Sequence, residues 1–189
     1  MTGLSNSVPR PKQMTLCNLF LEFGKTQGGW IATSTVLAFV LRSSLQSPNT
    51  IDLLLAFLVV SSWPLMEWIF HRFLMHEWTF LPFHFTHDRH HVTPTAATGL
   101  PDAWIVAMYF ANTIAFWWFG LAYLSTLNAA ILVMLVIYEF VHFSCHCNYK
   151  PITSWGWAVR VNHLQHHKLD ETKGYSMLFP IAHGKKQLK

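Results

Sequence analysis

Charged residues are scarce in this sequence of 189 residues. Asp, Glu, Lys and Arg together make up 12% of it, whereas ordinary soluble domains contain about 25%. The formal net charge is +4, but the basic residues form no long run, so no nucleic-acid partner is expected. Hydrophobic residues reach 52%, with nine Trp and fifteen Phe, and this composition favours a protein embedded in a membrane.

Other features that the sequence lacks exclude further classes of protein. The three cysteines, Cys17, Cys145 and Cys147, form no disulfide framework of the secreted kind. The first eighteen residues lack the apolar core of a signal peptide, so none is expected. No glycine-rich dinucleotide fingerprint occurs, so the chain is not expected to bind a nicotinamide or flavin in the Rossmann manner.

Long apolar stretches predict an all-α integral membrane protein. A membrane-spanning helix needs about 20 apolar residues, and about four stretches approach that length: 27–45, 51–70, 103–124 and 127–143. A tight turn is predicted at Ser125 and Thr126, between the last two. Residues 1–26 are expected to be a tail with an interfacial helix over 16–23, and residues 27–189 one membrane-embedded domain.

The basic residues predict the orientation of these helices. If four helices span the membrane, every Lys and Arg except Arg42 falls on the same side. Cytoplasmic loops carry the excess of Lys and Arg. Both termini are therefore expected in the cytoplasm, and residues 45–50 and 125–128 on the opposite side.

Histidines form four clusters, each at or beyond the same end of a predicted span. They contain ten of the twelve histidines: His71 and His76; His87, His90 and His91; His142 and His146; His163, His166 and His167. Neutral imidazole is the commonest metal ligand in proteins. Ten imidazoles exceed the needs of one ion, so the sequence predicts two metals on the cytoplasmic side, with His84 and His183 outside the clusters.

The spacing within the clusters is typical of chelation. Residues four apart share one face of an α-helix, as His142 and His146 do. Adjacent histidines point about 100° apart on a helix, so each of two ions can take one. His71 and His76 are five apart, or about 140° on a regular helix. Either the helix is distorted there or these two histidines reach different ions.

Four acidic residues lie close to the clusters. Glu67 precedes His71 by one turn, and Glu139 precedes His142 by three residues. A carboxylate within a span costs a few kcal/mol unless it is paired, and the usual partner near a metal is the N–H of a ligating imidazole. We expect this role for Glu67 and Glu139, with Asp88 and Asp170 as further candidates.

The four motifs together resemble the fatty acid hydroxylase superfamily, which includes sterol desaturases, lipid hydroxylases and short carotenoid hydroxylases. They read His-x4-His, His-x2-His-His, His-x3-His and His-x2-His-His, and the resemblance covers residues 60–180. The surroundings are also similar: Glu67, the pair Tyr138-Glu139, and the sequence His-His-Lys-Leu-Asp-Glu-Thr at 166–172. Gly174-Tyr-Ser-Met-Leu-Phe replaces the Gly-Val-Thr-Ser type of stretch found in many lipid hydroxylases.

The resemblance implies two iron ions held by the ten histidines, in a cytoplasmic helical cap over four transmembrane helices. It implies that O2 and two electrons oxidise an unactivated C–H bond. Zinc has no redox chemistry, so it could occupy the sites only inertly. Hydroxylation of a lipid or fatty acyl substrate is predicted, with desaturation or carotenoid hydroxylation as alternatives. A separate electron donor of the ferredoxin or cytochrome b5 type is expected, because the sequence contains no cytochrome b5 domain.

An alternative hypothesis, from outside the enzymes, is a membrane protein that handles metal or binds haem. Transport is disfavoured because the histidines cluster at the ends of the predicted spans. Haem is disfavoured because its axial histidines would lie within facing helices, and ten would not be needed. The metal content of the purified protein separates these readings.

Overall fold

The computed structural model describes residues 13–94 and 103–180. These residues form seven α-helices and one π-helix, in the order α1 (Leu16–Phe23), α2 (Gln27–Leu45), α3 (Thr50–Ile69), η1 (Phe70–Glu77), α4 (Pro82–Val92), α5 (Ala103–Trp118), α6 (Ala122–His146) and α7 (Ser154–Lys168). Within the described residues there is no strand, only an isolated bridge between Met14 and Tyr149. The prediction of an all-α protein is confirmed.

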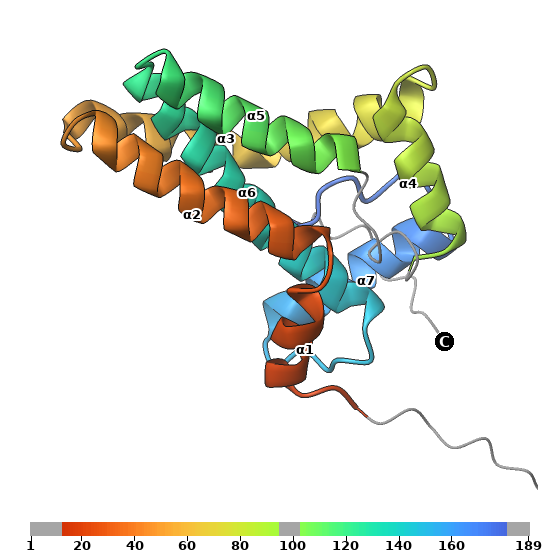
Figure 1. Cartoon of the computed structure of the whole chain (residues 1–189). Helices are drawn as coiled ribbons and strands as arrows, with labels where there is room; N and C mark the ends of the chain where they lie inside the picture. The colour runs from red at the N-terminus through yellow and green to blue at the C-terminus, as the bar shows by residue number, and fades with distance from the viewer. Residues whose placement is uncertain (1–12, 95–102, 181–189) are drawn as a thin grey trace, which may run out of the picture.

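Helix α6 is the centre of the bundle, because it packs against α2, α3 and α5. Leu132 of α6 is fully buried beside Ile31 of α2, and Met134 of α6 packs with Trp63 of α3. The four helices run side by side, and α4 and α7 lie beyond one end of them (Figure 1). We call α4 and α7 the cap.

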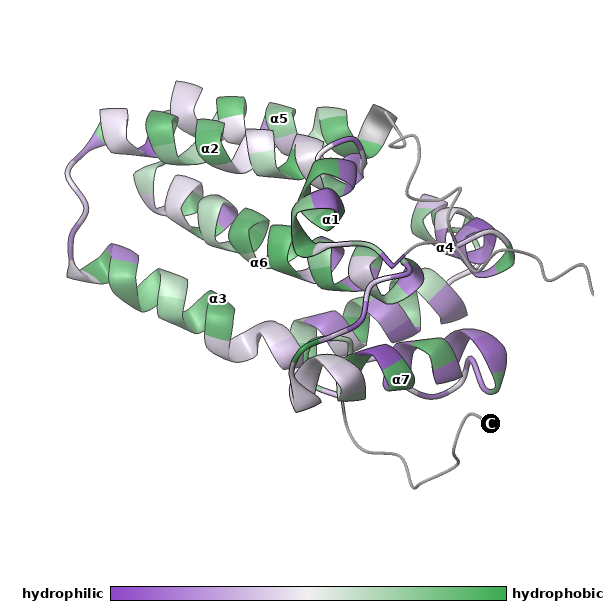
Figure 2. Cartoon of the chain, turned by 90° about the horizontal axis from the view of Figure 1, so that it is seen from below, coloured by the Kyte–Doolittle hydropathy of each residue, from purple (hydrophilic) through white to green (hydrophobic). Residues whose placement is uncertain are grey.

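The outer surface of the bundle is apolar. Thr50–Glu77 and Ala122–His146 are long and apolar enough to cross a membrane. On α3 the exposed fraction reaches 71% for Leu53 and 70% for Phe57, far more apolar exposure than a surface facing water usually has. Figure 2 shows hydrophobic colouring along the bundle and hydrophilic colouring over much of the cap. The bundle therefore has a surface suited to lipid.

The prediction of a turn at Ser125 and Thr126 is wrong. Helix α5 ends at Trp118, and α6 begins at Ala122, so Ser125 and Thr126 lie within the first turns of α6. The chain reverses at Gly120, whose φ of 66° is a left-handed conformation that glycine adopts without steric cost. The apolar residues after Gly120 concealed this turn in the sequence.

The Gly120→Ala variant is expected to lower the free energy of unfolding by about 1–2 kcal/mol, the usual cost of a left-handed residue with a Cβ. A Cβ at Gly120 would meet no atom within 4 Å, so the cost is conformational. Gly24→Ala is the control, because Gly24 has a φ of −59° that alanine adopts freely. Denaturant unfolding of both variants tests this, and equal stabilities would contradict it.

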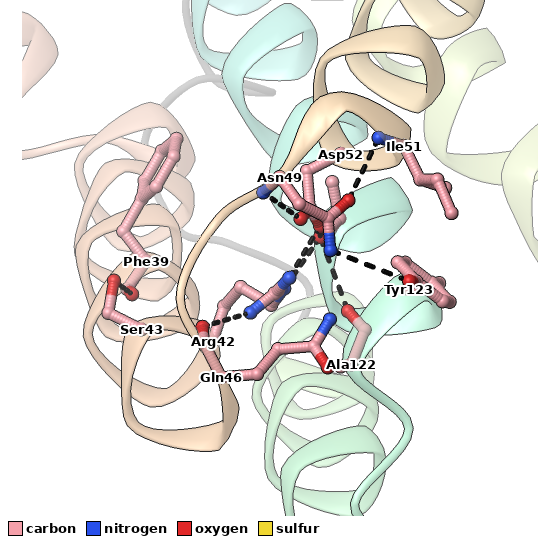
Figure 3. Close-up of polar contacts among 10 residues, drawn as sticks. Phe39, Arg42, Ser43, Gln46, Asn49, Ile51, Asp52, Ala122 and Tyr123 are labelled. Atoms are coloured by element: carbon pink, nitrogen blue, oxygen red, sulfur yellow. Dashed lines mark hydrogen bonds and ion pairs between the residues drawn. The ribbon is translucent and has the colours of Figure 1, made fainter.

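A buried ion pair ties three helices at the end of the bundle opposite the cap. Arg42 of α2 binds Asp52 of α3, with 2.5 Å between Nη2 and Oδ1. The hydroxyl of Thr126 on α6 donates to the same carboxylate oxygen and accepts from Arg42 Nε at 2.7 Å. Asp52 also accepts the backbone N–H of Asn49, closing a capping box at the start of α3 (Figure 3). Arg42, the one basic residue that the charge count placed on the side opposite the histidine clusters, is thus neutralised by Asp52.

Candidate metal centre

The spacing of His71 and His76 is explained by the π-helix η1. A π-helix forms hydrogen bonds between residues five apart instead of four, so side chains at i and i+5 come to the same side. The rings of His71 and His76 are stacked, with centroids 5.2 Å apart. Of the two explanations that the spacing left open, a distorted helix is the one observed.

The ten clustered histidines gather into two groups of five. Within each group the candidate ligand nitrogens all lie within 4.8 Å of one another. Two nitrogens on opposite sides of one ion are about 4.2 Å apart, since a metal–nitrogen bond is about 2.1 Å. Each group therefore has the dimensions of a single-ion site. Group 1 is His71, His76, His87, His91 and His166, and group 2 is His90, His142, His146, His163 and His167.

Adjacent histidines go to different groups, as their angular separation on a helix suggested. His90 belongs to group 2 and His91 to group 1, while His166 belongs to group 1 and His167 to group 2. The rings of His91 and His167 stack between the groups, with centroids 4.1 Å apart. Since α4 and α7 each contribute to both groups, neither group is complete without both cap helices.

The histidines of the cap are held neutral. Burial is the largest cause, and neighbouring histidines add to it: the pKa of His90 falls to about 3, and those of His87 and His163 lie well below the ordinary value. Burial also lowers the pKa of His166 to about 4. A neutral imidazole keeps the lone pair that a metal ligand needs.

The donor set of group 1 fits a cation better than hydrogen bonding. His71 Nδ1 donates to the carbonyl of Tyr175 at 2.8 Å, and His166 Nδ1 donates to that of Lys173 at 2.7 Å. In these neutral rings Nε2 then carries only a lone pair. His87 Nε2 lies 2.9–3.1 Å from Nε2 of His71, His76 and His91, yet a single hydrogen can serve only one of them.

Group 2 shows the same convergence. His90 Nε2 lies 2.8 Å from His142 Nε2 and 3.1 Å from His167 Nε2, and His163 Nε2 lies 2.7 Å from His146 Nε2. His90 Nε2 has either one hydrogen or one lone pair, so it can form a hydrogen bond with only one of these two neighbours, whereas a cation can bind all three nitrogens. Both groups therefore have residues that fit a bound metal ion.

The carboxylates do not have the contacts expected of them. Glu67 Oε1 accepts the backbone N–H groups of Met177 and Leu178. Asp88 Oδ2 lies 3.2 Å from His84 Nε2, outside both groups. Asp170 pairs with Lys173 and Thr172, and among the described residues Glu139 hydrogen-bonds no histidine. Glu139 instead lines a cavity between the helices.

Backbone carbonyls take the place expected for these carboxylates. The carbonyls of Tyr175 and Lys173 orient His71 and His166. Glu171 Oε1 lies 3.4 Å from His91 Nδ1 but does not form a hydrogen bond with it. Every residue has a carbonyl, so the sequence carries no signal for the two carbonyls. Glu171 belongs to the sequence His-His-Lys-Leu-Asp-Glu-Thr, so its position close to the histidines could be predicted.

An apolar cavity of about 300 Å³ leads to the two groups. His71 and His87 of group 1 line it together with His90 and His142 of group 2. Most of the remaining wall comes from apolar side chains of η1 and of the bundle helices, including Met66, Phe70, Ile105, Met108, Ile131 and Leu135. A long apolar molecule can therefore reach both groups from within the bundle.

Two histidine groups that could each hold one metal ion, at the end of an apolar helical bundle, are typical of a membrane-associated metalloprotein. A comparison with protein families matches residues 54–183 to the fatty acid hydroxylase family. The chain belongs to this family, and the matched segment contains all ten histidines of groups 1 and 2. Searches of curated proteins and of solved structures gave no match. The family indicates an oxidoreductase of the oxygenase or desaturase type.

Proposed function

We propose that the protein is an O2-dependent di-iron hydroxylase that oxidises an aliphatic C–H bond of a lipid or fatty acyl substrate. The observation that carries the proposal is the apolar cavity ending at histidines of both groups. Iron bound by groups 1 and 2 would supply the oxidising power that no side chain has. Zinc has no redox chemistry and would occupy the groups inertly.

The residues of the chain itself bind and orient the substrate. The wall of Met66, Phe70 and Leu135 removes the alkyl chain from water, which favours binding by about 25 cal/mol per Å² of apolar surface buried. The groups' position at one end of the bundle means that a chain lying along the helices presents one of its carbons to them. Desaturation of the same chain remains the alternative reaction, since the cavity serves both.

Oxidation of lipids by the purified protein tests this function. Iron-loaded protein is incubated with O2, membrane lipids and a reduced donor, either a ferredoxin or a cytochrome b5, and the lipids are analysed by mass spectrometry. The expected product gains one oxygen atom, with one O2 consumed for each product. Loss of two hydrogens would indicate desaturation instead. No product, together with the absorption of a bound haem, would contradict the proposal.

We also propose that α2, α3, α5 and α6 all cross the membrane and that the cap is cytoplasmic. The basic residues favour this orientation, and α2 has exposed apolar side chains such as Val36 and Val40. A reporter inserted in either of the short links 46–49 and 119–121 is expected to read as outside the cytoplasm. A cytoplasmic signal from either link would contradict this topology.

A further inference from the structure

Residues 173–178, which we call the strap, lie against group 1 without forming a helix or a strand. The carbonyl of Lys173 accepts from His166 Nδ1 at 2.7 Å, and that of Tyr175 accepts from His71 Nδ1 at 2.8 Å. Among the described residues, the hydrogen bonds between the strap and the ten clustered histidines all go to group 1. A hydrogen bond to the second ring nitrogen of a ligating histidine fixes its tautomer and its orientation. The position of the strap therefore determines where Nε2 of these two histidines points.

Glu67 fastens the strap to the helix that leads to His71. Its Oε1 accepts the backbone N–H groups of Met177 and Leu178, the second at 3.0 Å. Glu67 lies on α3, four residues before His71, and is 5% exposed. Met177 and Leu178 are buried as well, so no water replaces the carboxylate if it is removed. Two buried N–H groups would then have no acceptor, which is costly, and the strap would have to shift.

Asn162 fastens the strap to the helix that carries His166. Its Nδ2 donates to the carbonyl of Ser176 at 3.0 Å and to that of Gly174 at 3.4 Å. Asn162 lies on α7, four residues before His166, and it is buried. Its position therefore matches that of Glu67. Each of the two residues precedes a group 1 histidine by one helical turn and holds the segment whose carbonyl orients that histidine.

We propose that Glu67 and Asn162 are positioning residues of group 1: they hold the strap, and the strap orients His71 and His166 for the metal. Among the described residues neither side chain hydrogen-bonds a histidine, so their effect on the metal passes through the backbone of the strap. Group 2 has no hydrogen bond from the strap, so only the affinity of group 1 depends on them. The inference rests on the proposed function only in requiring a metal ion at group 1.

Equilibrium binding of Fe²⁺ to the purified metal-free protein, in detergent and without O2, tests the proposal. The titration gives one affinity for each group, and His146→Ala identifies that of group 2, because it removes a ligand of that group alone. Glu67→Met and Asn162→Leu should each lower the group 1 affinity about tenfold, the lower end of the range for residues that orient metal-bound histidines. Both variants should leave the group 2 affinity unchanged.

Glu67→Gln is the conservative variant that separates a hydrogen-bonding role from a merely structural one. Its amide oxygen can accept the same two N–H groups, so group 1 should bind Fe²⁺ nearly as tightly as in the wild type. Asn128→Leu is the matched control for Asn162→Leu. It removes a hydrogen bond of 2.9 Å to Thr113, which joins α6 to α5 away from the strap, and should change neither affinity.

An unchanged group 1 affinity in Glu67→Met, equal losses at both groups, or a Glu67→Gln variant as weak as Glu67→Met would overturn the proposal. Asn162→Leu decides by the same two affinities if Glu67→Met does not fold. Binding requires no turnover, so failure of oxidation would count against the proposed function alone. A wild type without a group 1 site would overturn both.

Discussion

His166→Ala is expected to remove the metal of group 1, to abolish oxidation and to release α7 from α4. His166 is the only residue of group 1 that comes from α7, and it is 1% exposed at the centre of the cap. By backbone contacts α4 packs against η1, whereas α7 packs against α6. The two cap helices are therefore joined through their histidines, and metal binding stabilises that junction.

Metal analysis, turnover and limited proteolysis of the cap measure these three effects. His90→Ala should reproduce them for group 2, since His90 is the one residue that α4 contributes there. His84→Ala is the control: His84 lies on α4 but contacts Met75 and Asp88 instead of either group. His183, which the sequence placed outside the clusters, lies outside the described residues. Wild-type metal content and turnover in His166→Ala would show that the grouping is wrong.

Asp52→Leu is expected to destabilise the protein by about 3–5 kcal/mol, the usual cost of leaving one member of a buried ion pair alone. The side chains of Arg42 and Asp52 are 6% and 9% exposed, so water screens neither. The uncompensated guanidinium would separate the ends of α2, α3 and α6, which the network of Figure 3 holds together. Thermal unfolding in detergent or lipid measures the loss.

The double variant Arg42→Met/Asp52→Leu distinguishes a lost ion pair from lost packing. Replacing both partners by apolar residues of similar size is often neutral, so most of the stability should return. Lys25→Met is the control, because it breaks an exposed pair with Glu22 that is worth at most about 1 kcal/mol. A double variant as unstable as Asp52→Leu would show that the charges are not responsible.

Helix positions were largely predictable, because they depend on runs of apolar residues. The predicted stretches 16–23 and 27–45 coincide with α1 and α2. The boundary between α5 and α6 was missed, since it depends on the backbone conformation of Gly120 within an apolar run. The contribution of Thr126 to the buried network was also hidden, because it arises only when α2, α3 and α6 come together.

The histidine clusters were predictable from spacing, whereas their division into groups was not. Adjacent histidines were expected to reach different ions, and His90 with His91 do divide in this way. The sequence left open whether His71 and His76 share an ion, because it does not reveal the π-helix that brings them together. The contacts of Glu67 were unpredictable for another reason: its partners, Met177 and Leu178, are more than a hundred residues away.

Anomalous diffraction at the iron edge, from crystals of the iron-loaded protein, tests the central claim most directly. The account predicts two iron peaks per chain, one among the Nε2 atoms of group 1 and the other among those of group 2. Each peak should have ligands from both cap helices, with His166 at the first and His90 at the second. A single iron peak would contradict the account, and so would a peak that lies outside both five-histidine groups.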